Sequence, residues 1–127
     1  MGFGQYSDAY KGRRTKDELL RSCKPGYLCA QLWGHNRLFV LYKDRSEYRL
    51  HDTPVVTKHE NGDLVIDDGG WPTLTTTAAI KQALSLATGG RPCNAWRAGK
   101  GKLYVCIGDF AFTAALPIRV SHVVRED

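Results

Sequence analysis

The sequence predicts an α+β protein in which a mostly antiparallel, twisted sheet of about six to eight strands packs against one main helix. Segments with alternating apolar and polar residues fill most of the region 27–68 and return after residue 94. Between them, the residues after Trp71 repeat with the 3.6-residue period of an amphipathic helix. A chain of 127 residues has the length of one domain, so we expect a single domain over 1–127.

The N-terminal part predicts an arm followed by a short helix. Residues 1–14 contain glycines, scattered aromatic side chains and a basic run, which is typical of a flexible basic arm. Thr15 stands three residues before Glu18, so each side chain can accept a hydrogen bond from the backbone N–H of the other. This capping box begins a short helix at about 16–23, which Pro25 ends.

An extended region follows, in which the residue period changes to two. The segments 27–33 and 38–42 predict a hairpin, and a turn at 43–46 leads to a longer extended stretch at 47–60. Proline cannot donate a hydrogen bond to a neighbouring strand, so we expect the stretch to break at Pro54.

The strongest turn signal in the chain is Asn61-Gly62. Both residues tolerate a positive φ, which predicts a two-residue type I′ turn between two strands. That turn pairs the flanking residues as follows: His59 with Leu64, Lys58 with Val65, and Thr57 with Ile66. In this register His59 is a strand-surface residue beside a turn rather than a catalytic base.

The main helix is predicted at about 76–88. Its apolar residues recur at i, i+3, i+4 and i+7, which places them on one stripe: Ile80, Ala83, Leu84 and Ala87. Gly89-Gly90 ends the helix. A second hairpin around 99–101 follows, and the segment 114–124 predicts a last short edge strand.

The corner DDGGWPTLTTT before this helix has two interpretations. In the structural one, Gly69 and Gly70 let the backbone leave a strand, and Trp71 anchors the corner in the core. Threonine hydroxyls then cap the first amides of the helix: Thr75, Thr76 and Thr77. In the functional one, the helix N-terminus and its threonines bind an anion such as phosphate. The chain lacks the G-x-x-x-x-G-K-[ST] string of a phosphate loop, so nucleotide hydrolysis is poorly supported.

The charge of the chain is unevenly distributed. Eighteen Lys and Arg residues against thirteen Asp and Glu residues give a net charge of +5. Residues 1–50 carry ten basic and five acidic side chains, residues 51–90 two and five, and residues 91–127 six and three. An acidic middle separates two basic ends, which form one positive surface if they meet in the fold. Ordinary solubilising charge explains the same distribution, so both interpretations stay open.

Basic residues next to aromatic ones are the candidates for binding a nucleic acid or a protein partner. Such a set neutralises phosphates and stacks bases, as β-ribbon and single-strand binders do. The candidates lie in the arm and in the second hairpin: Lys11, Arg13, Arg14, Arg91, Trp96, Arg97, Lys100 and Lys102. The chain contains no RNP, KH or zinc-finger signature, so the kind of nucleic acid stays open.

The four cysteines are predicted to be reduced structural thiols, because no C-x-x-C pair indicates a zinc ribbon or a thioredoxin-like motif. Cys29 and Cys106 lie in apolar strand patterns, where a reduced cysteine packs as a small hydrophobic residue. A disulfide or a four-thiolate metal site is the alternative. We expect no cofactor and no bound metal. We expect no membrane partner either, because no apolar run is long enough to cross a bilayer.

A metal-dependent nuclease is a further alternative, since two-metal cleavage of a phosphodiester uses clustered carboxylates with a base or an acid. The residues that could serve it lie in the acidic middle of the chain: His51, Asp52, His59, Glu60, Asp63, Asp67 and Asp68. No spacing typical of such a site links them, so the sequence favours a non-enzymatic protein.

The segment YRLHDTPVVTKHENGDLVIDDGGWPTLTTTAAIKQAL resembles a group of small proteins of unassigned function that tailed bacteriophages encode. In that group, a strand pair with a short turn leads to G-G-W-x-T-x-T-T and then to a helix. The residues that match this string are Gly69, Gly70, Trp71, Thr73, Thr75 and Thr76. Ala79 and Gln82 stand where the group often has a basic residue or an asparagine. The resemblance implies a phage or prophage origin and a location in the cytoplasm of the infected bacterium or in the virion, and it carries over no catalytic residue.

Three functions are compatible with these observations. The first is a small non-enzymatic phage protein that binds nucleic acid, a host protein or a nucleoprotein, in host takeover or counter-defence. The second is a structural component of the virion, since small β-rich domains with basic arms suit interlocking assemblies. The third is the metal-dependent nuclease. The charge asymmetry slightly favours the first.

Overall fold

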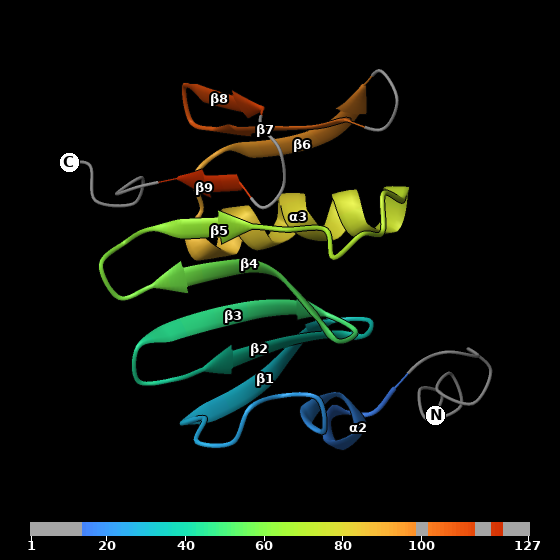
Figure 1. The fold of residues 1–127 in the computed structure, drawn as a ribbon. Helices are drawn as coiled ribbons and strands as arrows, with labels where there is room; N and C mark the ends of the chain where they lie inside the picture. Colours follow the sequence, from blue (N-terminus) through green and yellow to red (C-terminus); the bar gives the residue numbers. More distant parts are fainter. Residues whose placement is uncertain (1–13, 99–101, 114–117, 121–127) are drawn as a thin grey trace.

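The structure, a computed structural model, describes residues 14–98, 102–113 and 118–120. Its helices and strands follow in this chain order: α2 (Lys16–Leu20), β1 (Cys29–Gly34), β2 (Arg37–Leu41), β3 (Arg45–Leu50), β4 (Thr53–His59), β5 (Leu64–Ile66), α3 (Leu74–Ala87), β6 (Cys93–Ala98), β7 (Lys102–Ile107), β8 (Phe110–Thr113) and β9 (Ile118–Val120). Antiparallel strands around one long helix confirm the α+β class for this part of the chain (Figure 1). The predicted arm at 1–14 lies outside the described residues, except for Arg14.

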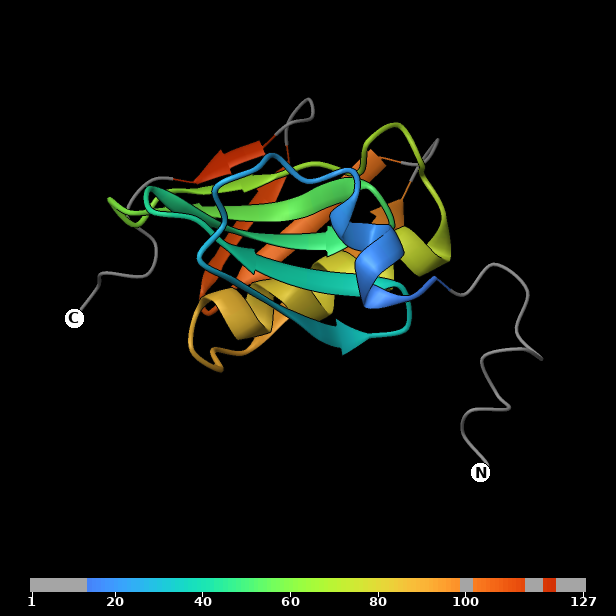
Figure 2. The same ribbon diagram turned by 90° about the horizontal axis from the view of Figure 1, so that it is seen from below.

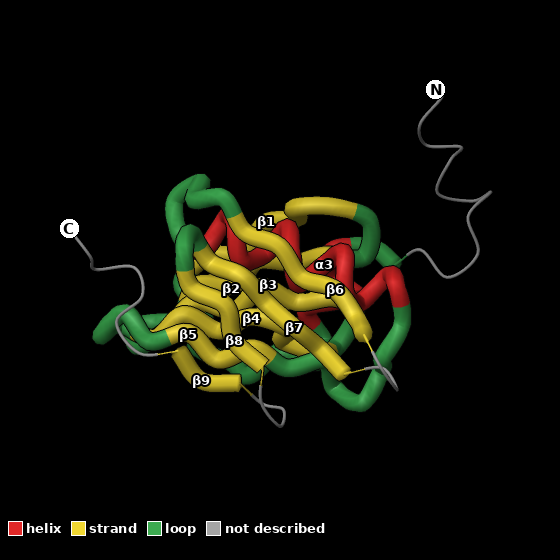
Figure 3. Tube along the Cα trace, turned by 90° about the horizontal axis from the view of Figure 1, so that it is seen from above, coloured by secondary structure: helices red, strands yellow, loops and turns green. Residues whose placement is uncertain are grey.

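The strands form two sheets rather than one. Strands β1 to β5 pair in sequence as an antiparallel meander and β9 pairs with β5, which gives a six-stranded sheet in the order β1-β2-β3-β4-β5-β9. Strands β6, β7 and β8 form a separate three-stranded antiparallel sheet. The chain passes from one sheet to the other through α3, which packs against β4 and has β6 running beside it (Figure 3). The helix therefore joins the two sheets as well as covering them.

The main core lies between α3 and the two sheets. The stripe that predicts the helix is the buried one, with Ile80, Ala83 and Leu84 at 0% exposure. It packs with apolar side chains from β3, β4, β5 and β9 of the larger sheet and from β6 and β7 of the smaller one. Figure 2 shows α3 running along one side of the strands of the larger sheet. The 3.6-residue period thus predicts both the helix and the face it buries.

The short helix α2 has the predicted capping box. Thr15 Oγ1 accepts a hydrogen bond from Glu18 N at 3.2 Å, and Glu18 Oε1 accepts one from Thr15 N at 2.8 Å. The helix ends at Leu20 rather than at residue 23, because the chain continues in a turn in which Cys23 N donates to Leu20 O.

Helix α2 covers the face of the larger sheet opposite to α3. Leu19 is fully buried and packs with Leu38 and Val40 of β2. Arg37, on the alternate face of the same strand, hydrogen bonds to Gln82 of α3. Since side chains alternate between the two faces of a strand, the two helices lie on opposite sides of β2.

The hairpin between β4 and β5 differs from the predicted type I′ turn. Asn61 does not have a positive φ, whereas Gly62 has a φ of 94° and donates from its N to His59 O at 2.9 Å. His59 N in turn donates to Asp63 O, so three residues form the loop, with glycine in the left-handed position. The register shifts by one residue and becomes Lys58 with Leu64, Thr57 with Val65, and Val56 with Ile66. The shift aligns the buried side chains of both strands on the core face.

A bulge, rather than a break, accommodates Pro54. Strand β3 ends at Leu50 and β4 starts at Thr53, so the expected interruption falls before the proline. The register jumps between Tyr48, which pairs with Val56, and the next residue of β3, which pairs with Pro54. Val55 is left without a direct partner, and both valines are buried in the core. The bulge interrupts the ladder where proline has no N–H to donate.

The cap of α3 lies earlier than predicted. The helix begins at Leu74, and Thr73 is its N-cap, whose Oγ1 accepts a hydrogen bond from Thr76 N at 3.1 Å. Thr75 and Thr76 are therefore residues of the first turn, and Thr77 donates from its hydroxyl to Thr73 O at 2.8 Å. The helix starts two residues before the expected start at about 76, because any of the clustered threonines can cap and only the backbone at Thr73 is extended.

Two glycines shape the corner before α3 in different ways. Gly69 has a φ of 64°, and a Cβ at this position would lie 2.6 Å from Thr53 Cγ2. Gly70 has a φ of 85°, but a Cβ there would meet open space. Gly69 is thus required both by its positive φ and by the close approach of Thr53, whereas Gly70 is required only by its positive φ.

Trp71 is not the core anchor that the sequence predicts. Its side chain is 64% exposed, and the neighbouring Leu74 is 83% exposed. The structural reason is that α3 begins directly after the corner and turns its buried stripe, not its first residue, toward the sheets. The corner therefore presents two large apolar side chains to solvent.

The cysteines are unpaired thiols in the described part of the chain. Cys29 is exposed, in contrast to the prediction, because β1 is an edge strand of the larger sheet. Cys106 is half-buried in the smaller sheet.

We expect Gly69→Ala to destabilise the protein by about 2–3 kcal/mol, since strain at a positive φ and a clash with the side chain of Thr53 act together. Gly70→Ala should cost only about 1 kcal/mol, because strain at the positive φ acts alone. Urea unfolding of both variants measures the difference. Equal losses in the two variants would show that the approach to Thr53 does not constrain the corner.

We expect Thr73→Ala to lower the free energy of unfolding by about 1 kcal/mol, because the first amides of α3 lose their side-chain acceptor. Thr75→Ala, which changes an exposed hydroxyl in the first turn, is the matched control and should leave stability within about 0.5 kcal/mol. Urea unfolding curves compare the two. A larger loss of stability in Thr75→Ala than in Thr73→Ala would contradict the assignment of Thr73 as the N-cap.

Candidate functional site

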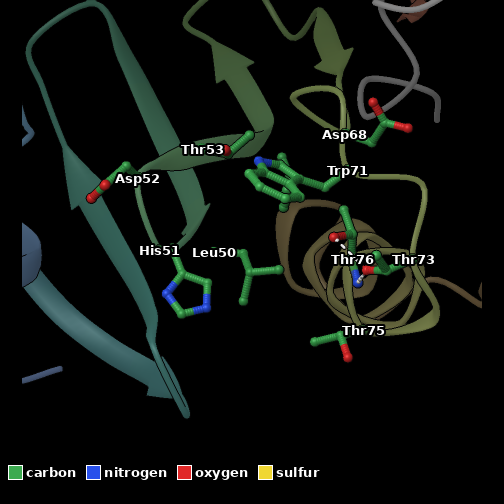
Figure 4. Close-up of a pocket in the computed structure, with 10 residues that line it drawn as sticks. Leu50, His51, Asp52, Thr53, Asp68, Trp71, Thr73, Thr75 and Thr76 are labelled. Atoms are coloured by element: carbon green, nitrogen blue, oxygen red, sulfur yellow. Dashed lines mark hydrogen bonds between the residues drawn. The ribbon is translucent and has the colours of Figure 1, made fainter. Parts of the chain in front are cut away.

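A pocket of about 450 Å³ opens where the turn between β3 and β4 faces the corner that precedes α3 (Figure 4). The end of β3, the start of β4, and the corner with the first turn of α3 contribute to it. The residues that line the pocket are Leu50, His51, Asp52, Thr53, Val55, Asp68, Trp71, Thr73, Thr75 and Thr76. The predicted structural corner is therefore one wall of a cavity.

Apolar side chains form much of the pocket surface. Leu50 and Val55 belong to the main core and are 7% and 0% exposed. Trp71 is the exposed part of this surface, and its indole lies between the β3–β4 turn and the start of α3 (Figure 4). Trp71 N donates to Asp68 O at 3.0 Å, and Trp71 O accepts from Thr73 N at 2.8 Å. A backbone fixed on both sides thus holds a solvent-exposed aromatic ring.

A buried ion pair fixes the corner to the smaller sheet. Asp68 Oδ2 lies 3.0 Å from Arg97 Nη2, and the two side chains are only 8% and 11% exposed. Asp68 Oδ1 also accepts from Gly70 N at 2.9 Å. Arg97 Nε donates to Thr77 Oγ1 at 2.9 Å, which connects the pair to α3. Hydrogen bonds to both partners are what a buried charge pair needs to offset desolvation.

His51 sits at the opposite side of the pocket in an unusual backbone conformation. Its φ is 54°, in the left-handed region that favours glycine, and its N donates to Asn36 O at 2.8 Å. Asn36 has a φ of 56°, is 5% exposed, and accepts a hydrogen bond on Oδ1 from Arg14 N. The turns before β2 and after β3 therefore hold each other in strained conformations, as often occurs at binding sites.

Charges around His51 shift the titration of two groups. Partial burial lowers the pKa of His51, and the nearby positive charge of Arg14 lowers it further, while Asp52 acts in the opposite direction. Partial burial raises the pKa of Asp52, but hydrogen bonds from Arg14 and Ser22 outweigh this effect and the pKa is lowered. Arg14 Nη1 lies 2.9 Å from Asp52 Oδ1. At neutral pH this side of the pocket carries a neutral imidazole beside an ion pair.

The structure separates the basic residues that the sequence groups together. In β6, Arg97 points to the core side and pairs with Asp68, whereas Trp96 lies on the other face of the sheet. Trp96 is 39% exposed and stacks on Tyr104 with ring centroids 5.7 Å apart. Lys102 is exposed and shares that face by its register. Side chains alternate between the two faces of a strand, and this alternation separates Arg97 from Trp96 and Lys102.

The remaining predicted residues lie at other places. Arg14 pairs with Asp52 at the pocket, and Arg91 lines a second groove beside α3. Lys11, Arg13 and Lys100 lie outside the described residues.

The carboxylates considered for a nuclease do not gather into a metal site in the described part of the chain, where no group of three or more His, Cys, Asp or Glu side chains could hold a metal ion. Asp63 lies 2.9 Å from Arg119 Nη2, and Asp68 is paired with Arg97. Asp67 accepts a hydrogen bond from Gly69 N at 3.0 Å. Among the described helices, none is long and apolar enough to cross a membrane.

Sequence reasoning did not identify the pocket. Leu50 and Thr53 carry no functional signal in the sequence, and His51 and Asp52 are candidates only for the metal-dependent nuclease. The available signal was the turn at His51-Asp52, which lies between two strand patterns. The close approach of Thr53, which follows this turn, to Gly69 depends on the pairing of β3 with β4 and cannot be predicted from local spacing.

We expect His51 to titrate below its ordinary value of 6.5 in the folded protein. Arg14→Gln should raise its pKa and Asp52→Asn should lower it, because the two charges act in opposite directions. The unfolded chain binds this proton near pH 6.5, so the contribution of His51 to stability should fall as the pH drops from 7 through the lowered pKa. NMR titration of the imidazole in the native protein and in both variants measures these shifts. An unchanged pKa in both variants would contradict the assignment.

Comparison with known proteins adds no relative: no protein-family model matches the chain, and neither curated proteins nor solved structures yielded a match.

Proposed function

We propose that this is a small, non-enzymatic binding protein of a phage or prophage, and that it binds single-stranded nucleic acid by taking one unstacked base into the pocket beside Trp71. The observation that carries the proposal is the 64% exposure of Trp71 at the edge of a pocket of about 450 Å³. Large aromatic side chains are usually buried, so a tryptophan held in solvent by its backbone is an available stacking surface.

The chemistry of the pocket fits a base better than a wholly apolar ligand. A base has an aromatic face that stacks on an indole, and such a contact is worth about 1–3 kcal/mol. Its polar edge needs hydrogen-bonding groups, and the pocket offers the Thr75 hydroxyl and the His51 imidazole. The volume is within the range of pockets that hold small ligands, about 300–1,000 Å³.

Charge supports a nucleic-acid partner. The chain carries +5, and the phosphate backbone of a single strand gains from positive charge along its path. The outer face of the smaller sheet adds a second aromatic pair, Trp96 with Tyr104, next to Lys102. Aromatic surfaces combined with basic residues are what sequence-tolerant single-strand binders use.

Binding is favoured over catalysis because the pocket carboxylates are already paired. Asp68 is held by Arg97, and Asp52 is held by Arg14. A general base or a metal ligand needs a carboxylate that can reach the substrate. The G-G-W-x-T-x-T-T resemblance supports the phage origin and a location in the infected bacterium, and its tryptophan and threonines line the pocket.

A protein partner is the second candidate. The exposed pair Trp71 and Leu74 would receive an apolar or aromatic side chain of a host protein as well as a base. Salt distinguishes the two, because binding through phosphates weakens steeply with salt and binding through an apolar contact does not. Nothing in the pocket favours the virion alternative specifically.

We expect Trp71→Ala to weaken binding of a labelled oligothymidine by about fivefold to a hundredfold, since one stacking contact is worth about 1–3 kcal/mol. Trp71→Phe should lose less. Fluorescence anisotropy at low salt measures affinity, and circular dichroism checks that the variants fold. Trp96→Ala is the comparison variant, because that tryptophan is also exposed but lies on the smaller sheet, and it should weaken binding less than Trp71→Ala does.

Equal affinity of the native protein and Trp71→Ala would contradict the pocket assignment. A loss with Trp96→Ala alone would move the binding surface to the smaller sheet. If the native protein binds no oligonucleotide at low salt, the proposed nucleic-acid function is contradicted.

A further inference from the structure

A second hollow, of about 390 Å³, lies between the exposed face of α3 and the start of β6. From α3 it is lined by Ala78, Lys81, Gln82 and Ser85, which recur at the spacing of one helix face. Arg91 and Cys93 line it from the other side. We call this hollow the α3 groove. It shares no lining residue with the pocket at Trp71.

The α3 groove lies in a part of the chain without acidic residues. From Gly69 to Gly108 the sequence contains no Asp and no Glu, and this stretch includes all of α3, β6 and β7. Lys81 is exposed on the helix face that lines the groove. A surface built from one sign of charge attracts an ion of the other sign more strongly than the net charge alone suggests.

Arg37, which reaches α3 from β2, differs from most of the described arginines. Carboxylates pair with the following arginines: Arg14, Arg45, Arg49, Arg97 and Arg119. Arg37 has neutral partners instead, because Nη1 donates to Gln82 Oε1 and the guanidinium lies 5.4 Å from the centre of the Trp33 ring.

The charge of Arg37 is also poorly solvated. Its Nε is buried without a hydrogen-bond partner among the described residues, and burial lowers the pKa of the guanidinium. A half-buried cation that has only neutral partners is stabilised when an anion binds close to it. Gln82, which accepts from Arg37 and also lines the α3 groove, places this cation next to the hollow.

The α3 groove continues the surface that begins at the Trp71 pocket. Thr75 lines the pocket, and Ala78 and Gln82 line the groove, three and seven residues farther along the same helix. At 1.5 Å per residue these steps correspond to about 5 Å and 10 Å along the helix axis. A single polymer chain can therefore contact both sites.

We propose that the α3 groove binds a backbone phosphate of the same nucleic-acid strand whose base enters the Trp71 pocket. The identity of the partner rests on the proposed function, and the groove adds the phosphate contact that the pocket lacks. Lys81 contacts the phosphate directly, and Arg37 supports it through Gln82. The strand runs along α3 from its N-terminal end toward the start of β6.

The test is the salt dependence of oligothymidine binding by the full chain. Lys81→Gln removes one phosphate contact, so the slope of log affinity against log salt should become shallower by about 0.7. Lys43→Gln is the matched control, because Lys43 is exposed in the turn between β2 and β3, away from α3. Arg37→Gln should also weaken binding, with circular dichroism to confirm that it folds. An unchanged slope in Lys81→Gln would overturn the proposal.

The two proposals fail differently. If Trp71→Ala weakens binding while Lys81→Gln behaves like Lys43→Gln, the pocket function stands and the α3 groove does not. If the native chain binds no oligonucleotide, both fall. If affinity depends on Lys81 but not on Trp71, the strand lies on the groove and the base pocket is contradicted.

A thiol measurement gives a second readout that needs no substitution. Cys93 lines the α3 groove, whereas Cys29 is exposed on the edge strand β1. Saturating oligothymidine should slow alkylation of Cys93 severalfold and leave Cys29 unchanged, as measured by peptide mass mapping. The experiment requires mildly alkaline buffer, because burial raises the pKa of the Cys93 thiol. Equal alkylation of Cys93 with and without the strand would contradict binding in the groove.

Discussion

The buried ion pair between Asp68 and Arg97 is the interaction on which the corner, the long helix and the smaller sheet depend together. Asp68 belongs to the segment that leaves β5, and Arg97 belongs to β6, so the pair closes the loop of chain that contains α3. Thr77 extends the contact to the first turns of the helix. Removing one partner of such a pair typically costs about 3–5 kcal/mol, because the other charge stays buried without compensation.

The same pair explains why an aromatic residue can stay exposed at the corner. The carboxylate of Asp68 accepts from Gly70 N, and its backbone carbonyl accepts from Trp71 N. The corner is thus held by polar contacts and does not need the indole to bury itself. A stacking surface fixed before the ligand arrives loses little conformational entropy on binding, which is the advantage of a preorganised site.

Opposite charges are distributed differently in the larger sheet and in the part of the chain that follows the corner. In the larger sheet, Glu47 of β3 lies between Arg45 and Arg49, at 2.9 Å and 2.8 Å, so acids and bases neutralise one another there. Beyond the corner, the chain has no acidic residue until Asp109. The net positive charge is therefore concentrated in the segment that contains Lys81, and we propose that this segregation sets the face that contacts a phosphate.

Local patterns in the sequence were sufficient for the elements but not for the site. The capping box at Thr15 and the apolar stripe of α3 are decided by hydrogen bonds and packing within one or two helical turns, and both are confirmed. The register of the Asn61-Gly62 turn differs by one residue from the prediction, and the cap of α3 lies two to four residues before the predicted threonines, because several neighbouring residues could serve each role equally well. The alternation of side chains along β6 also places Arg97 and Trp96 on opposite faces of the sheet, and this can be read from the sequence once one face is assigned to the core.

By itself, the sequence determined the α+β class, the helices and the positive charge, since each depends on local periodicity or composition. Only the tertiary structure decided that the corner is a pocket wall and that Trp71 faces solvent. The reason is that these features depend on which segments meet: Thr53 against Gly69, Asn36 against His51, and Asp68 against Arg97. Such contacts join residues that are distant in the chain, and no spacing within a single segment reveals them.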